Sequence, residues 1–167
     1  MSPYRQGVML FLFDRRGLIF CGKRRDSDPA KSGEGWQVPQ GGIDQGETLE
    51  AAVARELKEE VGAHVAARII AAAPKPMFYD FPDFLGSRKA FNGKYRGQMQ
   101  HAFLLFYSGD GGDIDISHSA DGEPPEFSAY DWKTPEQIRS LIVVFKRPLY
   151  DHALDYFEPM IAEYNAR

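Results

Sequence analysis

Three glutamates stand close together in the sequence, at Glu56, Glu59 and Glu60. On an α-helix these positions, i, i+3 and i+4, point to the same side. Like charges at this spacing destabilise a helix by about 0.2–0.5 kcal/mol per pair. The nearby cations Arg55 and Lys58 are expected on other faces of the helix. A divalent cation would turn the repulsion into binding, and Mg²⁺ is typically held by carboxylates together with substrate phosphates.

A solvated acidic helix face is the alternative, because glutamate-rich helices are common. Two neighbouring features favour a site instead. The glycine-rich loop 41–46 lets the backbone come close to a ligand or a metal. Glu47 precedes the three glutamates, and Arg55 is available to pair with it. The sequence therefore favours a metal site at the start of a loop–helix segment.

A helix from Thr48 to about Val61 must position these glutamates. Thr48 has the side chain of a helix N-cap. Gly62 stands where a C-terminal glycine cap belongs. One apolar stripe repeats every fourth residue, at Leu49, Val53, Leu57 and Val61. The stripe predicts which side of the helix faces the core, and the glutamates lie roughly opposite to it.

The rest of the chain alternates between strand patterns and helix patterns, which predicts an α/β sandwich. Strands are expected at 7–13, 18–23, 36–39, 65–73, 98–108 and 126–132, with a turn at 14–17 and long loops at 26–35, 74–97 and 109–122. Pro135 begins a short helix. The last helix spans 147–165, with Leu149, Ala153, Tyr156 and Phe157 expected on one side. We expect a single domain over residues 1–167.

The composition excludes several classes of protein. Of the 167 residues, 43% are hydrophobic and 13% aromatic, as in a globular chain. No apolar run is long enough to span a membrane, and the N-terminus is expected to be a strand, not a signal peptide. Cys21 is the single cysteine, which rules out an internal disulfide and suits the cytoplasm.

The charge pattern points to a compact anionic ligand. The net charge is −4, whereas a large nonspecific nucleic-acid binder would be basic. Basic side chains nevertheless gather in short groups, at 23–25, 88–89, 94–96 and 146–147. This arrangement fits a small anionic ligand, or one end of a nucleic acid, better than a long duplex.

The loop–helix segment also matches a family pattern. Gly41, Glu47, Arg55-Glu56-Leu57, Glu59-Glu60 and Gly62 stand at the spacing of the Nudix box, and the segment 41–63 resembles it at every invariant position. Ala63 is the one departure, where the family usually has a larger aliphatic residue. The resemblance implies hydrolysis of a nucleoside diphosphate linked to another group. It also implies a Nudix-type α/β/α sandwich with a mixed sheet and a loop–helix–loop catalytic motif.

The same resemblance implies the roles of the box residues. Glu56, Glu59 and Glu60 would bind Mg²⁺, for which Mn²⁺ can substitute, and Gly41 would add its backbone carbonyl. Glu47 would fix the geometry of the box through Arg55. Each of these assignments is an expectation from the family, and none follows from spacing alone.

Outside the box, residues 4–160 resemble the bacterial RNA pyrophosphohydrolases and the similar dinucleoside polyphosphate hydrolases. The resemblance rests on segments 4–5, 36–42, 79–82, 97–100, 125–127 and 145–147. It implies that Glu126 joins the metal cluster, that Arg5 and Lys146 contact phosphate, and that Arg24 and Phe145 hold a base by stacking. Trp36 and Tyr79 complete the substrate site, with packing in the core or a loop as the alternative for both. A surface position is the alternative for Glu126, Lys146, Arg5 and Arg24, and the core for Phe145.

Three functions follow from these observations. The leading one is removal of pyrophosphate from the 5′-triphosphate end of RNA, as a step of messenger decay. The second is hydrolysis of diadenosine tetraphosphate or related compounds by the same carboxylates. The third, a nucleotide-sensing module without catalysis, fits poorly because every box glutamate is kept. The expected partners are an RNA 5′ end or a nucleoside polyphosphate, with no membrane, and the expected state is a monomer.

Overall fold

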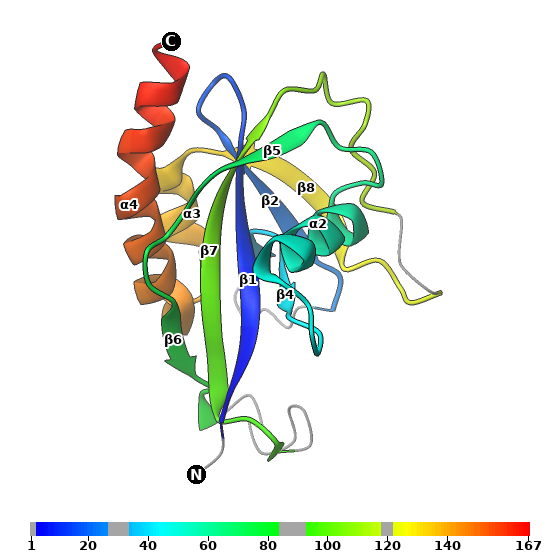
Figure 1. The fold of residues 1–167 in the computed structure, drawn as a ribbon, viewed down its shortest axis with the longest axis vertical. Coiled ribbons are helices and arrows are strands. Elements are labelled where there is room, and N and C mark those ends of the chain that lie inside the picture. Colours follow the sequence, from blue (N-terminus) through cyan, green and yellow to red (C-terminus); the bar gives the residue numbers. More distant parts are fainter. Residues whose placement is uncertain (1–2, 27–33, 84–92, 118–121) are drawn as a thin grey trace.

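The computed structural model describes residues 3–26, 34–83, 93–117 and 122–167. Within these ranges eight strands form one mixed sheet (Figure 1). The strands are β1 (Tyr4–Phe13), β2 (Ile19–Arg24), β3 (Trp36–Gln37), β4 (Gln40–Gly42), β5 (Ala67–Ala72), β6 (Met77–Asp80), β7 (Gly97–Tyr107) and β8 (Phe127–Lys133). The helices are α2 (Leu49–Glu60), α3 (Pro135–Leu141), the short 3₁₀ helix η3 (Val144–Lys146) and α4 (Arg147–Asn165).

Strand β1 lies in the middle of the sheet. It pairs in parallel with β7 along its whole length, and antiparallel with β4 near its start and β2 at its end. Residues 8–13 are fully buried because both faces of β1 are covered. Alternate residues enter two separate cores: Val8, Leu10 and Leu12 on one face, and Met9, Phe11 and Phe13 on the other. Burial on both sides explains why this strand is continuously apolar and does not alternate.

The two cores lie on opposite faces of the sheet, and helices cover both. Helix α2 packs over one face, and α3 and α4 cover the other (Figure 1). The predicted α/β/α sandwich is therefore confirmed. Helix α2 turns Val53 and Val61 toward β1, and Glu56 and Glu60 are buried on the same helix. The expectation that the glutamates lie opposite the apolar stripe was therefore wrong for these two.

Both ends of α2 are held by specific contacts. The Thr48 hydroxyl accepts a hydrogen bond from the Ala51 N–H at 3.1 Å, which confirms the predicted N-cap. The predicted glycine cap at Gly62 was wrong, because Gly62 does not adopt the left-handed conformation that such a cap needs. A Cβ at Gly62 would lie 2.6 Å from the Asp113 carbonyl oxygen. Glycine is needed here because the loop around Asp113 packs closely against the end of the helix.

Helix α4 is joined to the segment that leads into β4. The Tyr150 hydroxyl accepts a hydrogen bond from the Val38 N–H at 3.0 Å, and both residues are fully buried. Leu149, Ala153 and Phe157 face the core as predicted. Tyr156 is 38% exposed, so its predicted place on the apolar side was wrong. The buried side of α4 turns instead through Tyr150, Leu154 and Ile161, and Tyr156 falls at its border.

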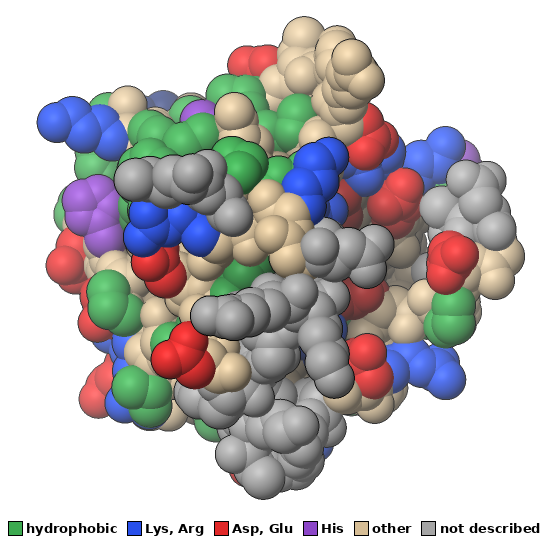
Figure 2. Space-filling model, turned by 90° about the horizontal axis from the view of Figure 1, so that it is seen from below, with side chains coloured by type: hydrophobic (Ala, Val, Ile, Leu, Met, Phe, Trp, Pro, Cys, Tyr) green, Lys and Arg blue, Asp and Glu red, His purple; other side chains and the backbone are tan. Residues whose placement is uncertain are grey.

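Other expectations hold in outline. The turn at 14–17 closes through a hydrogen bond from the Gly17 N–H to the Asp14 carbonyl at 2.9 Å. Strand β6 lies within the segment 74–97, which was expected to be a loop with short extended pieces. Parts of the predicted loops at 26–35 and 109–122, and the basic pair 88–89, lie outside the described residues. Seen from the end where β1 begins, the acidic and basic side chains of the described residues are interspersed (Figure 2).

No helix in the described ranges is both long enough and apolar enough to cross a membrane.

Candidate active site

The three box glutamates lie on the side of α2 that faces β4. Glu56 and Glu60 are only 5% and 8% exposed, whereas the Glu59 side chain is 33% exposed. A Glu60 carboxylate oxygen accepts a hydrogen bond from the Gln40 N–H at 3.0 Å. A Cβ at Gly41 would come within 1.9 Å of a Glu56 carboxylate oxygen. Only glycine therefore allows the strand backbone to lie this close to the carboxylates.

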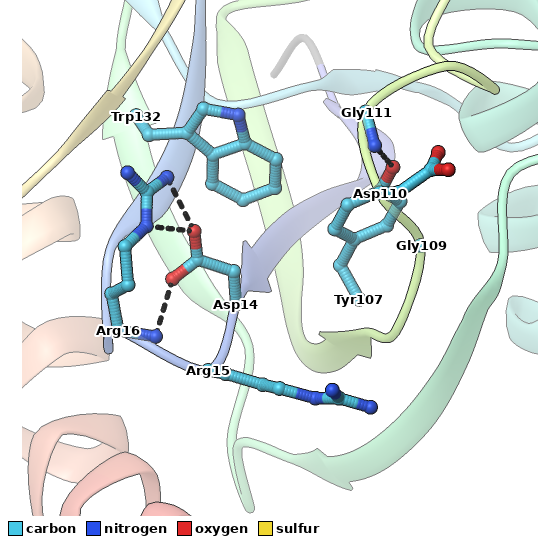
Figure 3. Close-up of a pocket in the computed structure, with 8 residues that line it drawn as sticks. All are labelled: Asp14, Arg15, Arg16, Tyr107, Gly109, Asp110, Gly111 and Trp132. Atoms are coloured by element: carbon cyan, nitrogen blue, oxygen red, sulfur yellow. Dashed lines mark hydrogen bonds and ion pairs between the residues drawn. The ribbon is translucent and has the colours of Figure 1, made fainter.

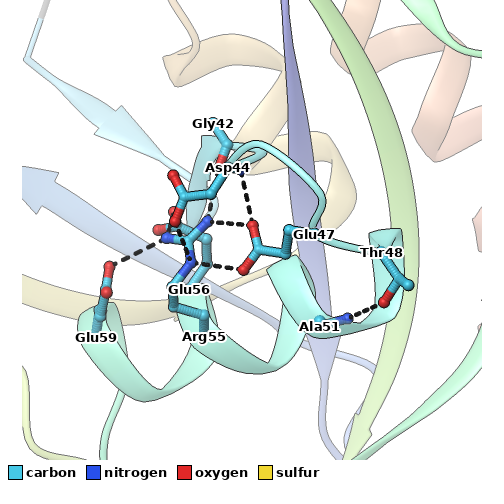
Figure 4. Close-up of polar contacts among 8 residues, drawn as sticks. All are labelled: Gly42, Asp44, Glu47, Thr48, Ala51, Arg55, Glu56 and Glu59. Carbon is cyan, nitrogen blue, oxygen red and sulfur yellow. Dashed lines mark hydrogen bonds and ion pairs between the residues drawn. The ribbon is translucent and has the colours of Figure 1, made fainter.

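Arg55 lies among these carboxylates (Figure 4). Its guanidinium donates to both Glu47 oxygens at 2.8 and 2.9 Å, to Glu56 at 2.6 Å and to the Gly42 carbonyl at 2.7 Å. It also approaches Glu59 at 3.5 Å. The expectation that Arg55 sits on another face was wrong, because a long side chain on a helix leans toward the preceding turn and can fold over its neighbours. Arg55 thus links the loop, the helix and the carboxylates.

The buried carboxylates have perturbed acidities. Burial raises the pKa of Glu56 to about 7, against the hydrogen bond from Arg55. Burial raises the pKa of Glu60 well above its ordinary value, and repulsion from Glu56 and Glu126 adds to this. The hydrogen bonds from Arg55 lower the pKa of Glu47 to about 2, with help from the Asp44 backbone. The carboxylates near β4 are therefore held close together where negative charge is costly, and a bound cation would offset that cost.

The chemistry of these residues fits a divalent metal ion. Their donors are carboxylate oxygens and a nearby backbone carbonyl, the hard ligands that such ions prefer. In the part of the chain that the structure describes, no three acidic or histidine side chains already converge on a metal position. Arg55 and the Gln40 N–H donate hydrogen bonds to oxygens of Glu56 and Glu60. Metal binding would need small rotations of these side chains.

Glu126 approaches the same region from the start of another strand of the sheet. It directly precedes β8, which pairs with β2, and its side chain is 42% exposed. One of its carboxylate oxygens lies 3.6 Å from Arg24 Nε. Its charge is also among the causes that raise the pKa of Glu60. Glu126 is therefore close enough to Glu60 for its charge to act on it. Its membership of a metal cluster, which the family resemblance implies, stays a prediction.

A small pocket is lined in part by Arg24, the residue that approaches Glu126. Four predicted substrate residues line it, namely Arg24, Trp36, Phe145 and Lys146. Its volume of about 40 Å³ leaves room for a few water molecules. A stacked base would therefore enter only if Arg24 or Phe145 moved. Arg5 lies on β1 beside the box loop, because a Cβ at Gly42 would come 2.2 Å from its guanidinium.

Tyr79 lies behind this pocket and is held by glutamines. Its ring centre is 5.8 Å from that of Phe145, and its hydroxyl donates to Gln98 at 2.7 Å. Gln98 also accepts a hydrogen bond from the Gln100 amide at 2.6 Å, and both glutamines are buried. Sequence reasoning gave them no role. The available signal was two glutamines alternating on one face of an apolar strand, since buried polar side chains need partners.

Lys146 is buried at the edge of the pocket. It is 9% exposed, and its ammonium lies 5.7 Å from the centre of the Tyr79 ring. Burial, together with the positive charge of Arg24, lowers the pKa of Lys146 to about 8. Within the described residues it forms no ion pair. The charge of Glu126 offsets the cost of the buried Lys146 cation only in part. A buried cation without an ion-pair partner destabilises the fold, which is typical of a group kept for binding an anion.

Replacing Lys146 with Met is expected to raise the free energy of unfolding at pH 7 by about 1–3 kcal/mol, because a buried charge is removed. The pKa of Lys146 is lower in the folded chain than the ordinary value of 10.5, so the unfolded chain binds the extra proton between about pH 8 and 10.5. Wild-type stability therefore rises across this window, and the advantage of the variant should shrink. Urea unfolding at pH 7 and pH 10 measures both.

The matched control is Lys75→Met, since Lys75 is exposed and should leave stability nearly unchanged. A Lys146→Met variant that is less stable than wild type at pH 7 would contradict the account of a costly buried charge.

Comparison with known proteins decides the family. The model of the NUDIX domain matches residues 3–153. The chain belongs to the Nudix family. Among curated Nudix relatives, the RNA pyrophosphohydrolase of Erythrobacter litoralis is 45% identical over 159 residues, covering 95% of this chain and 93% of the relative. The RNA pyrophosphohydrolase of Sphingopyxis alaskensis is 45% identical over 160 residues, covering 95% of this chain and 96% of the relative.

Solved Nudix structures share the fold at low sequence identity. The Ap4A hydrolase of C. elegans, in a binary complex, has a TM-score of 0.63 and 18% identity, covering 93% of this chain and 98% of that one. The dihydroneopterin triphosphate pyrophosphohydrolase of E. coli has a TM-score of 0.59 and 19% identity, covering 90% of this chain and 97% of that one. These likenesses establish the Nudix fold and say nothing about substrate. Nudix hydrolases generally use divalent metal ions, in agreement with the carboxylates near β4.

Proposed function

We propose that this protein removes pyrophosphate from the 5′-triphosphate end of RNA and leaves a 5′-monophosphate. The Nudix family and the curated relatives make it a hydrolase of phosphorus-containing anhydrides. In a cell the reaction would expose messenger RNA to decay, and we place the protein in the cytoplasm as a monomer. The alternative substrate is diadenosine tetraphosphate or another dinucleoside polyphosphate.

One observation carries the proposal. The Arg24–Glu126 contact connects the pocket of Arg24, Trp36, Phe145 and Lys146 to Glu126, whose charge acts on Glu60 of the box. A substrate could therefore place phosphates at the carboxylates and its first base at the pocket. Near-complete matches to RNA pyrophosphohydrolases support RNA as that substrate.

We assign each site residue a role in binding or in the reaction. Arg5 and Lys146 would bind the phosphates, and Arg24 and Phe145 would hold the base by stacking, with Trp36 and Tyr79 as its supports. Glu47 and Arg55 would keep the box loop in place. One carboxylate near β4 would accept a proton from the attacking water, whose oxygen bonds to phosphorus as the anhydride bond breaks. Pyrophosphate leaves, and the RNA keeps a single phosphate.

We propose that Gly41, Glu56, Glu59, Glu60 and Glu126 hold a divalent ion. With Mg²⁺ as the proposed ion and Mn²⁺ as a substitute, it would polarise phosphoryl oxygens and lower the pKa of the attacking water. Removing the ion with a chelator should abolish turnover, and adding it back should restore turnover.

The test compares Mg²⁺-dependent turnover of 5′-triphosphate RNA and diadenosine tetraphosphate at matched concentrations. A kcat/KM for RNA at least tenfold above that for the dinucleotide would support the proposal. The reverse preference would establish the alternative substrate, and Arg24 and Phe145 would need another role. Absence of turnover with both substrates would leave the nucleotide-sensing module as the remaining hypothesis.

Replacing Phe145 with Ala is expected to lower kcat/KM for RNA by about 10-fold or more, because stacking contributes roughly 1–3 kcal/mol per base. Turnover of diadenosine tetraphosphate should fall less. The matched control is Phe78→Ala. Phe78 lies on β6, is 54% exposed and does not line the pocket. Equal losses on both substrates would count against base stacking at Phe145.

A further inference from the structure

A second pocket lies at the other end of the sheet from the box. It has a volume of about 410 Å³, within the usual size range of ligand sites. Its lining consists of Arg15, Arg68, Phe106, Tyr164, Asn165 and Arg167, and no aspartate or glutamate is among these described residues. Val8 pairs with Gly41, and Arg15 follows the end of β1, so about 20 Å of strand separates this pocket from the box.

Three guanidiniums meet at this pocket in a chain whose net charge is −4. Two acidic residues lie next to lining residues along the chain. Asp14 already accepts hydrogen bonds from the Arg16 side chain at 2.7 and 2.9 Å, and Glu163 lies 3.5 Å from the Arg167 guanidinium. Figure 3 shows Arg16 closed onto Asp14, while Arg15 extends in another direction. Within the described residues, neither Arg15 nor Arg68 forms an ion pair with a carboxylate. Their charges are therefore available to a ligand.

Arg15 also borders a neighbouring pocket of about 250 Å³, lined by Asp14, Asp110 and Trp132 among others (Figure 3). Arg16 also lines that pocket and is paired with Asp14, so Asp110 is the carboxylate there that makes that side less favourable for an anion. Asp110 accepts a hydrogen bond from the Gly112 N–H at 2.9 Å and so keeps its place in the loop. An anion near Arg15 would therefore lie toward Arg68.

Aromatic rings form the inner wall of the arginine-lined pocket. The ring centres of Phe106 and Tyr164 are 4.7 Å apart, and Tyr164 packs edge-on against the buried Phe13 at 5.6 Å. Arg68 donates a hydrogen bond to the Tyr164 hydroxyl, and the Arg167 guanidinium lies 5.9 Å from the centre of its ring. These contacts fix Tyr164 between cations. A guanidinium rim with an aromatic wall matches a phosphate attached to a planar base.

We propose that this pocket binds the phosphate group of a nucleotide, with Arg15 and Arg68 as the principal contacts. Two sources supply that chemistry: a downstream nucleotide of the RNA substrate, or a free nucleotide that binds away from the box. The RNA source rests on the proposed function, whereas the free nucleotide does not. Binding of RNA at this pocket would add a contact with the substrate downstream of its first bases.

The experiment measures two ligands on one double variant, Arg15→Gln/Arg68→Gln. Binding of a ten-nucleotide RNA with a 5′-hydroxyl end is followed by fluorescence anisotropy, and binding of ADP by calorimetry. The RNA source predicts roughly tenfold weaker RNA binding, with a salt dependence whose slope falls by about 1.4, as expected when two single-strand phosphate contacts are lost. The free-nucleotide source predicts a similar loss for ADP and unchanged RNA binding.

Turnover separates this inference from the proposed function. With 5′-triphosphate RNA of two nucleotides, the double variant should keep wild-type kcat/KM, because the short substrate cannot reach the distal pocket. With a substrate of about 20 nucleotides it should lose activity if RNA is the source. Failure of the wild type to hydrolyse either RNA would overturn the proposed function, while the binding measurements would still decide on the pocket.

Two further variants keep the result interpretable. Lys75→Gln removes one exposed charge elsewhere and should bind both ligands like the wild type. Arg15→Lys/Arg68→Lys keeps the charges and should retain most of the affinity, which also shows whether losing the Arg68–Tyr164 hydrogen bond matters by itself. Unchanged RNA and ADP affinity in the Gln double variant would overturn the proposal.

Discussion

Replacing Glu60 with Gln is expected to lower kcat by about three orders of magnitude, with little change in stability. The loss follows because the proposed metal site would lose a negatively charged ligand. The neutral amide of the Glu60→Gln variant would bind a cation poorly in its place. The fold should tolerate the change because Gln has the same shape and no charge to bury. Burial and the neighbouring carboxylates raise the pKa of Glu60, which shows that its negative charge is costly in the metal-free chain.

The measurement is Mg²⁺-dependent turnover together with urea unfolding of the metal-free protein. The matched control is Glu50→Gln, which lies on the same helix, is exposed and should retain full activity. Adding Mg²⁺ should raise the melting temperature of the wild type and have a smaller effect on Glu60→Gln. Full activity in the Glu60 variant would remove the proposed carboxylate mechanism.

Replacing Arg55 with Met is expected to lower the free energy of unfolding by about 2 kcal/mol and kcat/KM by at least tenfold. Arg55 holds Glu47, Glu56 and the Gly42 carbonyl at once, so its loss leaves several acceptors without a donor. The stability loss should depend on pH. The pKa of Glu47 is lowered in the folded chain to about 2, so its pairing with Arg55 contributes above the unfolded value near 4.5 and is lost as the pH falls toward 2.

Urea unfolding at pH 7 and pH 3 should therefore show a wide gap between wild type and variant at pH 7 and a narrower gap at pH 3. Arg55→Lys keeps the charge but loses the forked donors of the guanidinium. Its stability should lie between those of the wild type and Arg55→Met. A double-mutant cycle with Glu47→Gln measures the coupling directly. Equal effects of Glu47→Gln in the presence and absence of Arg55 would show that the two side chains act independently.

Local signals in the sequence were sufficient for most of the fold. The continuous apolar run in β1, the Thr48 cap and Pro135 each depend on nearest neighbours along the chain, and each prediction agrees with the structure. The wrong predictions concern residues whose burial or packing depends on distant parts of the chain, which the spacing of residues in the sequence does not show. Gly62 is a glycine because a distant loop approaches it, and Tyr156 lies at the edge of a stripe whose direction is set by packing against the sheet.

For the candidate site too, some features could be predicted from the sequence and others depend on tertiary packing. The spacing of Glu56, Glu59 and Glu60 placed three carboxylates on one side of a helix, because helical geometry is local. The spacing could not show that two of them are buried, or that Arg55 folds over them, since both depend on the neighbouring strand β4. Glu126 was predicted only from a family resemblance, and the pairing of β8 with β2 is what brings it near Glu60.

By itself the sequence determined the elements, the family and the carboxylates that could bind a metal, because these depend on residue type and on short spacings. Only the tertiary structure decided which residues are buried and which residues distant in sequence lie next to one another. It places Lys146 in a costly buried position, Gln98 behind Tyr79, and Arg15 beside Arg68 at the far end of the sheet. The physical reason is that burial and long-range contacts depend on how strands and helices pack, and residues far apart in sequence carry no local record of that packing.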